Sequence, residues 1–151
     1  MVTTFTSREL VRDELVTLFV ANGSWQEVYG YAPSVDELSG KTPILVIRSR
    51  GTIQNFANLE TNPVTYRFVI SSAVLAYSAS DSWNSANAED KLDELDKVVR
   101  QVIRNNAGSL TYGVNMRFET AVSEVSDPIR EGLPYILESR FVLVDLPRGA
   151  I

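Results

Sequence analysis

The sequence predicts an α+β fold, in which a mainly antiparallel sheet of four to five strands has two amphipathic helices packed on one face. Two segments carry apolar residues at helical spacing, and the others alternate apolar and polar residues in runs rich in β-branched and aromatic side chains. The order is helix, weak strand, two strands, helix, two strands. It lacks the regular alternation of single strands and helices that a parallel sheet requires.

The first helix is predicted over residues 7–21. Thr6 and Glu9 have the spacing of a capping box, in which a hydroxyl and a carboxylate each accept a free backbone N–H. Asn22 and Gly23 supply a stop. One apolar stripe along this helix consists of Leu10, Val11, Leu15, Leu18 and Phe19.

Residues 24–42 predict a short edge strand and then a loop, because aromatic residues precede a stretch rich in proline and glycine. Strands follow over residues 44–49 and 64–77. The polar segment 51–63 between them is too long for a tight turn, and such loops commonly carry function or become ordered on a partner. The apolar face of the second strand consists of Val64, Tyr66, Phe68, Ile70 and Val74.

The second helix is predicted to begin at an Asn87 cap, after a polar linker over residues 78–88, and to run to Arg104. Acidic residues in its first turns and arginines in its last turns match the helix dipole. Gly108 is a terminator. Its apolar stripe consists of Leu92, Leu95, Val99 and Val102, widened by Val98 and Ile103.

Two more strands are predicted over residues 114–125 and 136–146. The first aligns Val114, Met116, Phe118 and Val122 on one face, and the second aligns Leu137, Phe141 and Leu143. The whole chain, residues 1–151, is expected to form a single domain. The face of the sheet away from the helices should be partly polar, and symmetric assembly is one way to protect it and the strand edges.

Composition excludes several kinds of chemistry. The chain has 151 residues, a net charge of −5, no cysteine and no histidine, so thiol nucleophiles, Ser-His-Asp triads and histidine or cysteine metal sites are ruled out. The negative charge disfavours nucleic acid and anionic lipid. No signal peptide or membrane span is expected. We therefore expect no enzymatic activity, cofactor, metal, membrane association or sequence-specific nucleic-acid binding.

Carboxylates support one alternative, a small ligand-binding or enzymatic α+β domain that uses acids in a pocket. An acidic cluster begins the second helix, where the helix dipole already explains it. Acids on the strands are also explained by a solvated sheet face. The cluster is Glu89, Asp90, Asp93 and Glu94, and the strand acids are Glu119, Glu124, Glu138 and Asp145.

Arginines on the strands support a further alternative, a basic stripe that contacts nucleic acid. Neighbouring acids favour cross-strand ion pairs instead, since Glu119 lies near Arg117 and Glu138 near Arg140. Aromatic residues in segments that read as loop or edge are candidates for interface anchors or for closing the core. The arginines are Arg48, Arg50, Arg67, Arg117 and Arg140, and the aromatic residues are Trp25, Tyr29, Tyr31 and Trp83.

The element order and two local segments resemble the tail terminator proteins of long-tailed bacteriophages. The segments are Ala-Glu-Asp-x-Leu-Asp-x-Leu at residues 88–95, in the second helix, and Tyr-Ile-Leu-Glu-Ser-Arg-Phe at residues 135–141, in the last strand. The resemblance extends over most of the chain. Residues 24–42 depart from it. Other neck and minor tail proteins have a similar pattern and stay open as an alternative.

The resemblance implies a structural virion protein that is assembled in the host cytoplasm. It would form a homo-oligomer, a hexameric ring, that caps the tail tube, ends its polymerisation and joins it to the head connector. Its partners would be the tail tube protein and the head-tail connector protein. The candidate partner contacts are Arg50, Gln54, Asn55, Phe56, Asn58, Leu59, Trp83 and Arg148.

Overall fold

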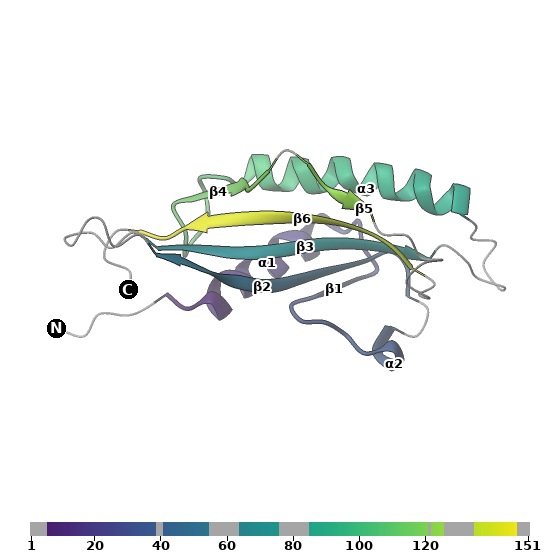
Figure 1. The fold of residues 1–151 in the computed structure, drawn as a ribbon, viewed down its shortest axis with the longest axis horizontal. Coiled ribbons are helices and arrows are strands. Elements are labelled where there is room, and N and C mark those ends of the chain that lie inside the picture. Colours follow the sequence, from purple (N-terminus) through teal and green to yellow (C-terminus); the bar gives the residue numbers. More distant parts are fainter. Residues whose placement is uncertain are drawn as a thin grey trace.

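A computed structural model of the chain describes residues 6–38, 41–54, 64–75, 85–120, 122–125 and 135–147. Within these residues, three helices and one six-stranded, mostly antiparallel sheet form the predicted α+β fold (Figure 1). The elements are α1 (Arg8–Asn22), β1 (Glu27–Tyr29), α2 (Val35–Leu38), β2 (Ile44–Gln54), β3 (Val64–Leu75), α3 (Ser85–Asn105), β4 (Asn115–Phe118), β5 (Glu124–Val125) and β6 (Tyr135–Asp145).

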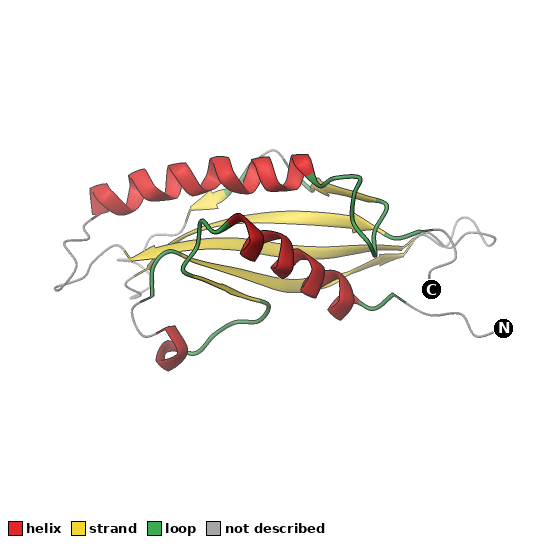
Figure 2. Ribbon diagram, turned by 180° about the vertical axis from the view of Figure 1, so that it is seen from behind, coloured by secondary structure: helices red, strands yellow, loops and turns green. Residues whose placement is uncertain are grey.

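The sheet has the strand order β1-β2-β3-β6-β4, and β5 pairs with β6 beside β4. Only the β1–β2 pair is parallel among these strands. Figure 2 shows α1 and α3 lying on the same face, as predicted. Side chains from both helices and from the sheet form one continuous core there. The helix-covered face therefore provides the main hydrophobic stabilisation of the fold.

Helix α1 agrees with the predicted range to within one residue, but its cap differs. Ser7, not Thr6, is the N-cap, and its Oγ accepts a hydrogen bond of 3.2 Å from the backbone N–H of Leu10. The predicted stop at Gly23 is confirmed. Gly23 has a φ of 74°, in the left-handed region that glycine adopts without strain, and its N–H donates to the carbonyl of Val20.

Helix α3 carries the predicted apolar stripe on its buried side, with Leu92, Leu95, Val99 and Val102 all in the core. The helix begins at Ser85, so the prediction of an Asn87 cap is wrong and Asn87 lies within the first turn. It ends at Asn105, close to the predicted end. The periodicity of the stripe thus fixed the helix face correctly, while a local capping signal misplaced its start.

Strand β2 continues to Gln54, past the predicted end at Ser49. A bulge between Ser49 and Gly51 adds one residue to this strand, and Gly51 has a φ of 133°. The predicted loop was therefore wrong for residues 51–54, because a bulge lets a strand continue through a residue that suggests a turn. Residues 55–63 of that loop lie outside the described residues.

The predicted strand over residues 114–125 is two short strands, β4 and β5, which is why the sheet has more strands than the four to five expected. Both pair with β6 along the same edge, β4 with its last residues and β5 with its middle. Alternation had suggested one apolar face, but Val114 is 53% exposed and Val122 is 72% exposed, while Met116 is buried. The chain leaves the sheet between the strands, so the pattern does not correspond to one buried face.

The N-terminal edge of the sheet is β1, which confirms an edge strand within residues 24–42. Its parallel pairing with β2 and the short helix α2 were not predicted. Trp25 and Tyr29 were candidates either for interface anchors or for closing the core, and both are buried in hydrophobic clusters, which confirms the second alternative for them. Tyr31 is exposed, and its hydroxyl donates to Glu37 Oε2 at 2.6 Å.

Candidate functional site

The face of the sheet opposite α1 and α3 is the candidate site, and we call it the open face. Alternation along each strand directs every second side chain away from the helices. The register aligns Arg48, Val69 and Phe141 across three neighbouring strands, and Arg67 lies opposite Leu143. Within the described residues no long helix covers this region. We define the centre of the open face as Arg48, Arg50, Ile53, Arg67, Val69, Phe141 and Leu143.

Phe141 is the aromatic centre of the open face. The guanidinium carbon of Arg67 lies 4.4 Å from its ring centroid, and that of Arg50 lies 5.7 Å away. Glu119 fixes Arg67 through two hydrogen bonds, one of them 3.1 Å from Nη2 to Oε1. The hydrogen bond with Glu119 raises the pKa of the Arg67 guanidinium. Arg50 is more exposed, and its guanidinium lies over the same ring.

Two cations at the centre of the open face have no carboxylate partner within the described part of the chain. Arg48 and Arg50 are exposed, and neither makes an ion pair with any residue that the structure describes. Val69 and Phe141 beside them are only partly buried. Cations above partly buried apolar groups form a surface complementary to an acidic and apolar partner.

One end of the open face is polar and internally paired. Asp145 accepts hydrogen bonds from Thr65 Oγ1 at 2.6 Å and Asn115 Nδ2 at 3.3 Å, and it forms an ion pair with Arg117. Burial alone would raise the pKa of Asp145, but these hydrogen bonds outweigh it and lower the pKa. The Asp145 contribution to stability is thus present above the unfolded-state pKa and lost as pH falls through the folded-state value.

The other end of the open face is apolar. A small cluster there is built from β1, β2, β3 and β6, and Leu38 of α2 packs against it. Beside it lies a groove of about 280 Å³, with Arg48 at its rim. The cluster consists of Tyr29, Ile44, Val46, Ala73, Leu75 and Tyr135.

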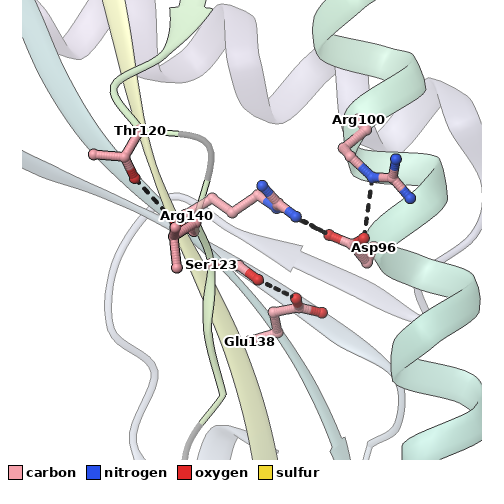
Figure 3. A network of polar contacts seen from close by, with 7 residues as sticks. Asp96, Arg100, Thr120, Ser123, Glu138 and Arg140 are labelled. Atoms are coloured by element: carbon pink, nitrogen blue, oxygen red, sulfur yellow. Dashed lines mark hydrogen bonds and ion pairs between the residues drawn. The ribbon is translucent and has the colours of Figure 1, made fainter.

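On the helix-covered face, Asp96 of α3 binds two arginines (Figure 3). Arg140 Nη2 lies 2.7 Å from Asp96 Oδ1, and Arg100 Nε lies 3.0 Å from Oδ2. The prediction of cross-strand ion pairs was therefore wrong for Arg140, which pairs with a residue of the helix. The prediction is confirmed for Arg67 and Arg117, because each forms an ion pair across the sheet with an acid on the open face.

Among the predicted strand acids, Glu138 is the one to test against the alternative of a ligand-binding or enzymatic pocket, because it lies beside a small cavity. Burial raises its pKa, although a hydrogen bond from Ser123 Oγ opposes the shift. The cavity beside it, lined by Ser72, Asp96 and Arg140 among others, has a volume of about 10 Å³. That space holds one water molecule at most. It is too small for an organic substrate.

A second interaction surface lies between the last turns of α3 and β4, and we call it the arginine groove. Its volume is about 520 Å³, and its apolar floor includes Ile103 and Met116, both buried. The polar lining residues are Arg100, Arg104, Arg117, Arg140, Glu119 and Thr120.

Of the predicted partner contacts, the structure places Arg50 at the centre of the open face and Gln54 at the end of β2. Asn55, Phe56, Asn58, Leu59, Trp83 and Arg148 lie outside the described residues. Sequence reasoning missed Phe141 and Leu143 as surface residues. The signal was available, because β6 has apolar residues at both odd and even positions and so has two apolar faces.

Among the described residues, no three Asp or Glu side chains gather closely enough to bind a metal ion. No described helix is both long enough and apolar enough to cross a bilayer. No protein-family model and no curated protein matches this chain.

Proposed function

We propose that this chain is a structural subunit of a bacteriophage tail, a tail terminator that assembles into a ring, caps the tail tube and joins it to the head connector. The observation that carries the proposal is the open face, where two arginines without an ion pair to any described residue lie beside partly buried apolar side chains. The order of elements and the segments 88–95 and 135–141 support it as a resemblance.

The sheet edges offer backbone groups as well as side chains. The terminal strands β1 and β4 have three and four residues, and β5 has two. Since β1 pairs only with Ile44, Leu45 and Val46, the rest of β2, as far as Gln54, has no strand beside it on that side among the described residues. Contacts with another subunit would therefore have this strand edge available in addition to the side chains of the open face.

The open face would bind the tail tube or the connector. Arg48 and Arg50 have no carboxylate partner among the described residues, so a partner with acidic side chains would satisfy both cations. Val69 and Phe141 would lose their remaining contact with water in the same step. On this proposal the open face is incomplete until the partner covers it.

Electron microscopy of the purified protein over a concentration series, with sedimentation alongside, tests the proposal. We expect closed six-membered rings, and capped tube ends once cognate tail tubes are added. A chain that stays monomeric at every concentration and leaves tube ends free would contradict it. Rings that do not bind tube ends but bind another tail or neck component would favour the neck or minor tail alternative.

A further inference from the structure

The arginine groove carries more cations than its own acids can balance. Arg100 and Arg140 share Asp96, and Arg117 pairs with Asp145. Glu119, which lines the groove, is already bound to Arg67. Arg104 makes no ion pair with any described residue. A local positive surface therefore remains on a chain with a net charge of −5.

The same flank of α3 that ends in the groove begins with acids. Glu89, Asp93, Asp96, Arg100 and Arg104 follow one another at intervals of three or four residues, so they form one stripe along the helix. Glu89 and Asp93 are exposed, and neither makes an ion pair with another described residue. The stripe is thus acidic in its first half and basic in its second.

Asp96 and Arg100 pair in the middle of the stripe, but the charges at its two ends cannot neutralise one another within one subunit. Glu89 and Arg104 are fifteen residues apart on one helix, which corresponds to about 22 Å at 1.5 Å per residue. At physiological ionic strength, interactions between exposed charges are largely screened beyond about 8 Å. Only another molecule can bring an acidic half against a basic half.

Building on the ring-forming function proposed above, we propose that the acidic first half of α3 from a second copy of this chain binds in the arginine groove. Asp93 of one copy would meet Arg104 of the next, and Glu89 would meet Arg100. Each subunit would offer its acidic half to one neighbour and its groove to the other. Such a heterologous contact closes into a ring when the rotation between neighbours allows it.

The apolar floor of the groove supports a protein occupant. Phe118, which is partly exposed, and the aliphatic stems of the lining arginines would contact aliphatic parts of the docked helix, over a floor formed by Ile103 and Met116. Nucleic acid is the competing occupant, but the net charge of −5 opposes a long polyanion while leaving a short acidic helix half acceptable.

Two charge reversals test the contact, one on each side. Arg104→Glu makes the groove more acidic, and Asp93→Arg makes the first half of α3 more basic. Each variant alone brings like charges together, so we expect self-association measured by sedimentation at 0.15 M salt to weaken at least about tenfold. An equimolar mixture should recover assembly, because the introduced arginine then meets the introduced glutamate. At 1 M salt the differences should shrink.

Matched controls carry the same change in charge elsewhere. Arg8→Glu lies on α1, and Glu94→Arg lies about 100° around α3 from Asp93. Both should leave the ion pairs of the stripe intact and associate as the unaltered chain does. Circular dichroism should show that all four variants fold.

The outcomes separate this contact from the ring itself. Rings that are unaffected by either reversal would overturn the contact and leave the proposed function standing. If mixing the two variants restores assembly but the assembly stops at two copies, the contact is supported and the ring is contradicted. A chain that stays monomeric at every concentration would overturn the contact. So would binding of duplex DNA to the unaltered chain that Arg104→Glu abolishes while self-association is unchanged.

Discussion

The two faces of the central sheet are built from alternate residues of the same strands, yet they differ in how completely their side chains are buried from water. Phe68 and Val142 on the helix-covered face are fully buried. Their chain neighbours Val69 and Phe141, one residue along on the open face, are only partly buried and lie among arginines. The covered face therefore stabilises the fold, and the open face holds apolar surface whose burial is incomplete.

Charge is treated differently on the two faces as well. On the covered face, Arg140 is nearly enclosed and bonded to Asp96, since a buried cation without a partner is strongly destabilising. On the open face, Arg48 and Arg50 have no carboxylate partner among the residues that the structure describes, and they are tolerated there because water solvates them. The contrast teaches that stability and partner binding can be changed separately in this sheet.

The largest expected effect is a buried charge on the covered side. Val99→Asp should cost about 4 kcal/mol or more and leave the chain largely unfolded, because Val99 is buried in the stripe of α3. Val69→Asp on the open face should cost only about 1 kcal/mol. Thermal unfolding followed by circular dichroism compares them. Similar melting temperatures for both variants would mean that the two faces contribute equally to stability.

A milder comparison truncates one aromatic ring on each face. Phe68→Ala should lower the free energy of unfolding by about 3–5 kcal/mol, because it opens a cavity in the core. Phe141→Ala should lower it by about 1–2 kcal/mol, through partial loss of burial and of the contacts with Arg67 and Arg50. Urea denaturation measures both. A larger loss for Phe141→Ala would mean that the open face also carries the fold.

Reversing the free cations should separate binding from stability. The double variant Arg48→Glu and Arg50→Glu should keep its free energy of unfolding within about 1 kcal/mol. Its binding to tail tube ends should fall at least about tenfold, as like charges then face an acidic partner. Co-sedimentation with tubes measures this, and Arg8→Glu with Lys97→Glu is the control of equal charge. Unchanged tube binding would remove the open face from the docking model.

The smallest expected effect concerns Glu138. Burial raises its pKa, so its favourable contribution is complete below the unfolded-state pKa and is lost as pH rises through the folded-state pKa. Glu138→Gln should therefore stabilise the fold at pH 7 by less than about 1 kcal/mol, with the difference vanishing in acid. Melting curves across pH 3–8 test it. A variant less stable than the parent at pH 7 would show that the charged form is preferred.

Long apolar periodicities predicted the fold well. The stripe of α3 and the alternation of β3 were correct because each spans several turns or pairs along a side that packs on the core. In α1, Val11, Leu15 and Phe19 are buried as predicted, but Leu10, at the start of the predicted stripe, is 37% exposed. Short signals failed where tertiary contacts override them. Thr6 and Asn87 had capping chemistry, but neighbouring residues begin the helices, and Val114 and Val122 alternated without a surface to pack on.

The candidate surfaces were less predictable, because each depends on residues that meet only after folding. Arg50 was expected as a contact from its place beside a long polar segment. Its ring partner Phe141 is ninety-one positions away in the sequence, and nothing local connects the two. The arginine groove likewise needs the end of α3 beside β4, which pairs on the far side of β6.

The bulge in β2 shifts the alternation of side chains between the two faces by one residue. Ser49 pairs with Phe68 and Gly51 pairs with Arg67, so Arg50 is an additional residue with no counterpart on β3. Counting by twos from Ile47 would otherwise place Ile53 on the covered side. The single inserted position sends Ile53 to the open side and adds a cation there, without removing an apolar residue from the core. Loss of one residue at this point would exchange the two sides for the rest of the strand.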